Sequence, residues 1–147
     1  MTETEWAYFA GILDGEGSIY ASASVPSKQP SGKVYTCCQT TLCVTNSDPR
    51  LIDWLASKLP GNTQEYTPAQ TPKNSRKRVF KWYCNGENMC VALRGALPYL
   101  IIKKRQAELM LELRATFQAG RGSKAMTDQE RAHREHLVQL IKAENQR

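Results

Sequence analysis

The amino-acid sequence predicts an α+β protein with a four-stranded antiparallel sheet. Two pairs of strand-like segments are each joined by a loop of turn-forming residues, which is typical of a β-hairpin. Segments with apolar residues at helical spacing precede, separate and follow these pairs. The order helix, hairpin, helix, hairpin, helices fits the α+β class. At this length we expect residues 1–147 to form one domain.

The first predicted helix carries a stripe of small residues. A capping box of Thr2 and Glu5 opens it, and Ala7, Gly11 and Gly15 recur every four residues, so that one face has almost no side chains. Each interior glycine costs a helix roughly 1 kcal/mol relative to alanine. Two such glycines therefore indicate that another backbone approaches this face closely.

Two carboxylates, Asp14 and Glu16, stand where this helix ends, and Gly17 is predicted to leave it in the left-handed conformation. A carboxylate at this end faces the negative pole of the helix dipole, and a bound cation would offset that cost. The alternative is a solvated loop acid beside an ordinary glycine cap, and this stretch alone leaves both open. A membrane helix is excluded, because acids interrupt a run much shorter than the roughly 20 apolar residues that spanning needs.

The later elements follow from strand alternation and helix caps. The hairpins are expected at Ile19–Val25 with Lys33–Thr45 and at Thr63–Thr67 with Arg78–Asn85. Between them Asp48 caps a helix whose first residue is Pro49. Further helices are expected at Glu87–Leu97, at Tyr99–Gln118 after Pro98, and at the periphery over 127–146, where Thr127 and Glu130 form a second capping box.

Composition favours a polyanionic partner. The net charge is +6 and the isoelectric point about 9.2. The five cysteines are odd in number and contain no CxxC pair, which argues against zinc and for reduced thiols. We see no signal peptide and no transmembrane segment, and expect the protein in the cytoplasm or the compartment where it is made.

A cationic run and a polar strand phase are candidates for nucleic-acid contacts. Five cations and no acid occur between Lys73 and Lys81, which fits either a solvated loop or contacts to phosphate and guanine. One phase of the strand before residue 45 is rich in short hydrogen-bonding groups. That pattern fits base readout, but most half-exposed sheets show it too. Periodicity does not decide whether the phase of Arg78 or that of Lys81 and Tyr83 faces a partner.

The residues Phe9–Gly17, FAGILDGEG, resemble the LAGLIDADG motif of homing endonucleases. The stretch 97–107, LPYLIIKKRQA, resembles a second element of that family, in which a lysine reaches the active site. The resemblance implies the αββαββα fold, with a saddle-shaped sheet in the DNA major groove. A chain with one motif is expected to act as a homodimer.

The resemblance also implies site residues. Catalytic roles fall on Glu16, Asn46, Arg50 and Lys103, with Lys104 as the alternative lysine. Mg²⁺ would bind Glu16 and the Gly15 carbonyl, Mn²⁺ or Ca²⁺ being other possible occupants, while Asp14 is structural or an alternative ligand. The residues expected to contact DNA are Ser22, Ser24, Gln39, Thr41, Gln64, Tyr66, Arg76, Arg78 and Lys81. Those expected at the dimer interface are Ala7, Gly11, Asp14 and Gly15.

The expected function is Mg²⁺-dependent hydrolysis of both strands of a long, pseudo-palindromic double-stranded DNA site by a homodimer, as in intron homing. The alternatives are an intron maturase that binds RNA, a catalytically silent DNA-binding regulator of the same fold, and a basic scaffold that uses neither groove nor metal.

Overall fold

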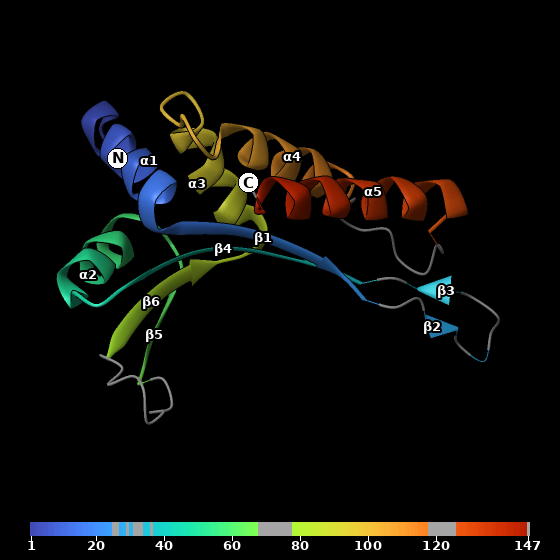
Figure 1. Cartoon of the computed structure of the whole chain (residues 1–147), viewed down its shortest axis with the longest axis horizontal. Helices are drawn as coiled ribbons and strands as arrows, with labels where there is room; N and C mark the ends of the chain where they lie inside the picture. Colours follow the sequence, from blue (N-terminus) through green and yellow to red (C-terminus); the bar gives the residue numbers. More distant parts are fainter. Residues whose placement is uncertain are drawn as a thin grey trace. The chain divides into compact units, whose positions relative to one another are not determined.

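A computed structural model describes residues 1–24, 27–28, 30, 34–35, 37–67, 78–117 and 126–146. The helices are α1 (Glu3–Glu16), α2 (Pro49–Lys58), α3 (Gly86–Ala96), α4 (Lys104–Ala115) and α5 (Asp128–Glu144). Strands β1 (Gly17–Ala23), β4 (Cys38–Asn46), β5 (Asn62–Tyr66) and β6 (Val79–Cys84) form one sheet in the order β1-β4-β6-β5 (Figure 1). The short strands β2 (Ser27–Lys28) and β3 (Val34–Tyr35) form another. The predicted α+β class with a four-stranded antiparallel sheet is confirmed.

The chain divides into two compact units, which are described separately. The first consists of Met1–Ser18 and Thr41–Lys103, and the second of Ile19–Thr40 and Lys104–Arg147. That residues 1–147 act as one domain stays a prediction.

The first unit buries its helices against β6. Phe9 of α1 meets Trp82 of β6 edge to face, with ring centroids 6.1 Å apart, and both side chains are fully buried. Helix α2 packs on β5 and β6 through Ile52 and Leu55. Helix α3 lies against α1, where the Trp6 ring occupies the space over Gly95.

The second unit is held by the packing of α4 against α5. The Arg134 side chain of α5 is buried, donates to the hydroxyl and the carbonyl of Thr116, and lies over the Phe117 ring. Asn145, which caps α5, donates from Nδ2 to the Ile19 carbonyl at 3.0 Å. The expected capping box of Thr127 and Glu130 is present at the other end of α5.

Two expectations about helix ends are wrong. Gly17 leaves α1 in an extended conformation, with φ −80° and ψ 154°, and not in the left-handed one. Glycine is needed there for space, because a Cβ would lie 2.7 Å from the backbone of Leu13. The helix expected from Tyr99 begins only at Lys104, since Asp14 of α1 accepts the backbone N–H groups of Ile101 and Lys103.

The first hairpin is more divided than predicted. The expected strand Lys33–Thr45 appears as β3 and β4, and β2 lies inside the expected loop. Near the junction the Ser24 N–H donates to the Cys37 carbonyl at 2.8 Å, and the Cys37 N–H donates to Ser24 Oγ at 2.9 Å. The backbone N–H and the hydroxyl oxygen of Ser24, a residue expected to contact DNA, therefore both have partners within the chain.

All five cysteines are free thiols. Burial raises the pKa of the Cys84 thiol to about 12, so this side chain is a neutral core group. In the described part of the chain no helix is long and apolar enough to cross a membrane. The compartment stays a prediction.

Candidate active site and nucleic-acid face

The end of α1 is tied to the segment that follows α3 by three hydrogen bonds. Asp14 Oδ2 accepts the N–H of Ile101 at 2.9 Å, and Oδ1 accepts that of Lys103 at 2.9 Å. The Lys103 Nζ donates in turn to the Asp14 carbonyl at 2.6 Å. An ammonium at the carbonyl end of a helix is also favoured by the helix dipole. Lys103 is therefore fixed at the end of the helix that carries Glu16.

Glu16 is the last residue of α1, and its side chain is exposed. Among the described residues its carboxylate has no hydrogen-bond or ion-pair partner, whereas both carboxylate oxygens of Asp14 are engaged. The carboxylate that is open to a ligand is therefore that of Glu16. Lys104, the alternative lysine, is the first residue of α4 and belongs to the second unit.

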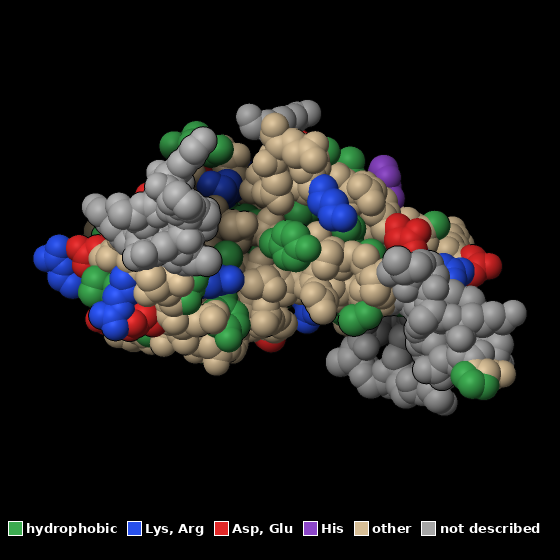
Figure 2. Space-filling model, turned by 60° about the horizontal axis from the view of Figure 1, so that its bottom comes forward, with side chains coloured by type: hydrophobic (Ala, Val, Ile, Leu, Met, Phe, Trp, Pro, Cys, Tyr) green, Lys and Arg blue, Asp and Glu red, His purple; other side chains and the backbone are tan. Residues whose placement is uncertain are grey.

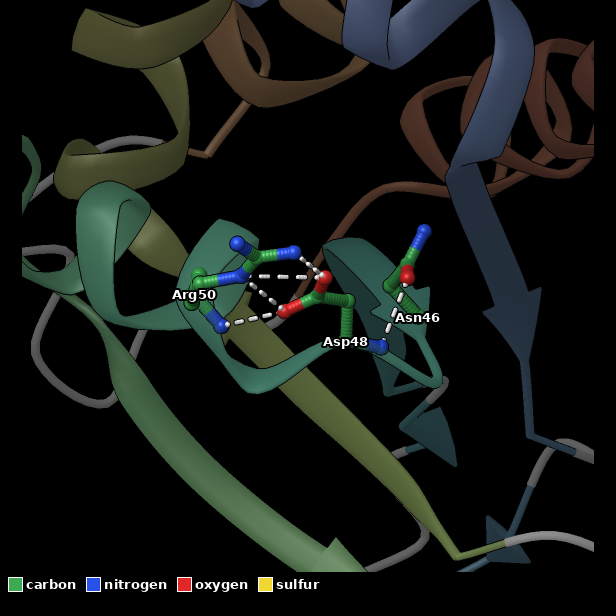
Figure 3. Close-up of polar contacts among 3 residues, drawn as sticks. All are labelled: Asn46, Asp48 and Arg50. Carbon is green, nitrogen blue, oxygen red and sulfur yellow. Dashed lines mark hydrogen bonds and ion pairs between the residues drawn. The ribbon is translucent and has the colours of Figure 1, made fainter.

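Asn46, Asp48 and Arg50 form a second cluster in the first unit (Figure 3). Asn46 Oδ1 accepts the Asp48 N–H at 2.8 Å, and the Asp48 carboxylate caps α2 by accepting the Arg50 N–H at 3.0 Å. The Arg50 guanidinium folds back onto the same carboxylate, with Nε 3.0 Å from Oδ1 and Nη2 2.5 Å from Oδ2. The guanidinium holds the pKa of Asp48 at about 2, well below its usual range, with the N–H of the helix cap as the second cause.

This pair gives a local reason for a cation in the first turn of α2, where the helix dipole disfavours it. The Arg50 side chain is still 88% exposed, so one edge of the guanidinium is open to solvent. A hollow of about 490 Å³ lies beside it, lined by Tyr8, Asn46, Asp48, Arg50, Leu51 and Trp54. Of the residues that line the hollow, Tyr8 and Trp54 contact each other edge to face, with ring centroids 4.9 Å apart.

The register of β4, β6 and β5 decides which strand phase is open. Trp82 and Cys84 are buried, and Lys81 and Tyr83 alternate with them on the opposite face. Thr45 of β4 and Gln64 of β5 both pair with Lys81, which makes one row of polar side chains across three strands. The phase of Lys81 and Tyr83 is therefore the less buried one, and that it faces a partner stays a prediction.

The open phases contain residues that the sequence did not single out. Paired residues share a face, so Cys43 and Asn62 flank Tyr83 in a second row. What identifies Cys43 and Asn62 is the pairing register of the strands, which a single sequence does not provide. On the open phases lie Thr41, Cys43 and Thr45 of β4, Asn62, Gln64 and Tyr66 of β5, and Val79, Lys81 and Tyr83 of β6.

In the view of Figure 2 much of the described surface is neither charged nor hydrophobic side chain, and Lys and Arg side chains are scattered over it among hydrophobic ones. Such a mixture suits contacts to bases and phosphates. In the second unit Ser22 lies within β1 and Ser24 directly follows it, and Gln39 is exposed in the same phase of β4 as Thr41.

Arg78 is separated from this set. It precedes β6 in the phase of Phe80 and Trp82, it forms an ion pair with Glu65, and its guanidinium lies 5.7 Å from the Phe80 ring centroid. Arg76 and most of the cationic run lie outside the described residues. Of the cations in this run that the structure describes, Lys81 is the one on the open face.

The stripe on α1 is bare and exposed. Ala7, Gly11 and Gly15 are exposed, and a Cβ placed on either glycine would meet nothing within 4 Å. Thr4 and Tyr8 extend the same exposed side, and the charged residue next to it, Asp14, uses its carboxylate for the N–H groups of Ile101 and Lys103. Among the described residues Trp54 meets Tyr8 at one edge of this side, and the two glycines are left uncovered.

Among the described residues, no group of three or more His, Cys, Asp and Glu side chains lies close enough to hold a metal ion. The Glu16 carboxylate and the Gly15 carbonyl are hard oxygen donors of the kind that Mg²⁺ prefers. They fit a site in which phosphate, water or a second chain provides the remaining ligands.

No protein-family model matches the chain, and no curated protein matches its sequence. Solved structures match its fold. The homing endonuclease I-CvuI in complex with its target in the presence of calcium has a TM-score of 0.70 and 17% identity, over 97% of this chain and 82% of that one. I-CvuI was also solved in the presence of magnesium with its DNA not cleaved, at the same TM-score.

Two further structures agree. The archaeal intron-encoded homing endonuclease I-Vdi141I complexed with DNA has a TM-score of 0.74 and 16% identity, over 97% of this chain and 84% of that one. The LAGLIDADG homing endonuclease I-GzeII in complex with its DNA target has a TM-score of 0.56 and 14% identity, over 94% of this chain and 43% of that one. The chain therefore has the fold of the LAGLIDADG homing endonucleases.

Proposed function

We propose that this chain is a site-specific endonuclease that hydrolyses both strands of a pseudo-palindromic DNA site as a homodimer. The observation that carries the proposal is the end of α1, where Asp14 fixes Lys103 beside the helix terminus that presents the Glu16 carboxylate. The known proteins with this fold described above were solved with DNA, which supports the same partner here.

The residues divide the chemistry between them. Glu16 and the Gly15 carbonyl would hold a divalent cation, which when bound polarises the scissile phosphate and lowers the pKa of bound water. Lys103 and Arg50 are cations that stabilise the charge developing on the phosphate. Asn46 uses Oδ1 for the Asp48 N–H, which leaves its Nδ2 to orient a water molecule. We assign Asp14 the role of a brace, with a ligand role as the alternative, because each oxygen of its carboxylate already accepts a backbone N–H group.

The number of active sites needed and the exposed side of α1 both support the association of two chains. One chain offers one such carboxylate, whereas two strands need two active sites, and a two-fold dimer supplies both. The uncharged stripe on α1 is open for a second helix to approach closely. The open sheet face, with Thr41, Gln64, Tyr66 and Lys81, would read one half of the DNA site.

Glu16→Gln tests the proposal. The DNA substrate joins the genomic sequences that flank the gene, since a homing site is the uninterrupted insertion locus. We expect the wild type to cut both strands with Mg²⁺, and the variant to bind this DNA as well or better but not to cut it, because a negative charge next to phosphate is removed. Glu87→Gln, at an exposed position of α3, is the matched control and should cut normally. Cleavage by Glu16→Gln at the wild-type rate would exclude the assignment.

A further inference from the structure

Two adjacent isoleucines form the most exposed apolar surface among the described residues. Ile101 is 86% and Ile102 is 74% exposed, while the other exposed large apolar side chains reach at most 56%. Burial of an isoleucine side chain away from water lowers the free energy in proportion to the apolar area covered. Two in sequence, both directed to solvent, call for a partner that covers them.

These isoleucines are not on a loose loop tip. The Asp14 carboxylate holds the N–H groups of Ile101 and Lys103, on either side of Ile102, so the backbone that presents both side chains is fixed to α1. The pair is thus a preorganised apolar projection, which can be buried with little loss of conformational entropy.

The projection is continuous with the bare stripe. Asp14 lies on α1 between Gly11 and Gly15, so the segment that it holds adjoins the uncharged side of that helix. A surface that combines a flat stripe with a neighbouring projection can fit against a copy of itself, as a two-fold interface requires. DNA is a poorer occupant, since aliphatic side chains offer nothing to a phosphate backbone.

We propose that Ile101 and Ile102 dock on a second copy of this chain and form, with the α1 stripe, one continuous dimer interface. The inference rests on the homodimer of the proposed function and adds the residues that hold it together. It also places Lys103 directly after an interface residue, so that the segment in contact with the second copy is the one that delivers the lysine.

The test is the double substitution Ile101→Asp with Ile102→Asp, followed by sedimentation at several protein concentrations. Each interface holds two copies of the segment, so the dimer dissociation constant should rise at least about 100-fold. Ile101→Ala with Ile102→Ala should give a smaller rise. Thermal unfolding of the monomer should hardly change, because both side chains are exposed.

Val91→Asp is the matched control, since Val91 is an aliphatic residue of α3 that is 47% exposed and lies outside this surface; it should leave dimerisation unchanged. A wild-type dimer that tolerates both isoleucine substitutions with an unchanged dissociation constant would overturn the inference and leave the nuclease proposal standing. An unchanged dimer with weaker DNA binding would also overturn it and assign the isoleucines to DNA. If the wild type is a dimer that never cuts DNA and the Asp variant is monomeric, the inference is supported and the nuclease proposal is rejected.

Discussion

Substitutions at Gly11 should change the stability of one chain and the association of two chains in opposite directions. A Cβ at this position meets nothing within 4 Å in the described chain, so Gly11→Ala creates no clash. Alanine is favoured over an interior helical glycine by up to about 1 kcal/mol, and leucine by nearly as much. Each substitution should therefore stabilise the monomer by roughly 0.5–1 kcal/mol.

Association should follow the opposite order. In the proposed dimer, helix α1 meets its copy along the stripe, so a methyl group at position 11 weakens the contact and an isobutyl group prevents it. We expect the wild type to associate most tightly, Gly11→Ala less so, and Gly11→Leu to be monomeric at micromolar concentration. DNA cleavage should be lost with Gly11→Leu, although all four proposed catalytic residues remain in place.

Three measurements check the expected rank of these proteins in stability and in association. They are denaturant unfolding at a concentration below dimerisation, sedimentation at micromolar concentration, and cleavage of the insertion-site DNA. Dilution matters for the first, because a dimer gains apparent stability by mass action. A Gly11→Leu protein that remains dimeric and cuts DNA at the wild-type rate would refute the assignment of the stripe to the interface.

The other predictions concern single contacts. Gly17→Ala should destabilise the chain by roughly 1–3 kcal/mol in denaturant unfolding, because its Cβ would lie 2.7 Å from the backbone four residues earlier. Lys81→Ala should lower the slope of log affinity for DNA against log salt by about one unit, while Arg78→Ala, which loses a cation already paired, should change it less; the reverse result would mean that the open face was assigned wrongly. The depressed pKa of Asp48 contributes stability that is present above its ordinary value near 3.8 and is lost as the pH falls towards 2, so Asp48→Asn should flatten the dependence of the melting temperature on pH in that range. Asp14→Ala should cost roughly 1–3 kcal/mol and Asp14→Asn less, with no shift in the metal concentration needed for half-maximal cleavage, a shift being the sign of a ligand.

The sequence predicted the elements well where local rules decide them. The capping boxes at Thr2 and Thr127 and the cap at Asp48 are all present, because a helix start depends on residues within one turn. The phase of short polar side chains expected in the strand before residue 45 is also the less buried one in β4, since alternation over nine residues is a strong signal.

The errors arose where distant parts of the chain meet. Residues 99–103 have a helical pattern, but Asp14, 87 residues from Ile101 in the sequence, accepts the N–H of Ile101 and also that of Lys103, which a helix begun at Tyr99 would direct to the Tyr99 carbonyl. Gly17 was assigned a left-handed cap because glycine commonly serves so, whereas space against Leu13 is what requires it. The partner of Arg50 and the choice of the less buried phase between Arg78 and Lys81 were left open by the sequence, because they depend on side-chain geometry and burial.

The brace at the end of α1 bears on how dimerisation would control cleavage. The bonds among Asp14, Ile101 and Lys103 form within a single chain, so they are present before a second copy arrives. Association then has no need to build this part of the site. It adds what one chain lacks, namely a second carboxylate, cover for the isoleucine pair, and a second sheet for the other half of the DNA. Activity should therefore depend on protein concentration as binding does, with no slower conformational step, because each subunit joins in its final geometry.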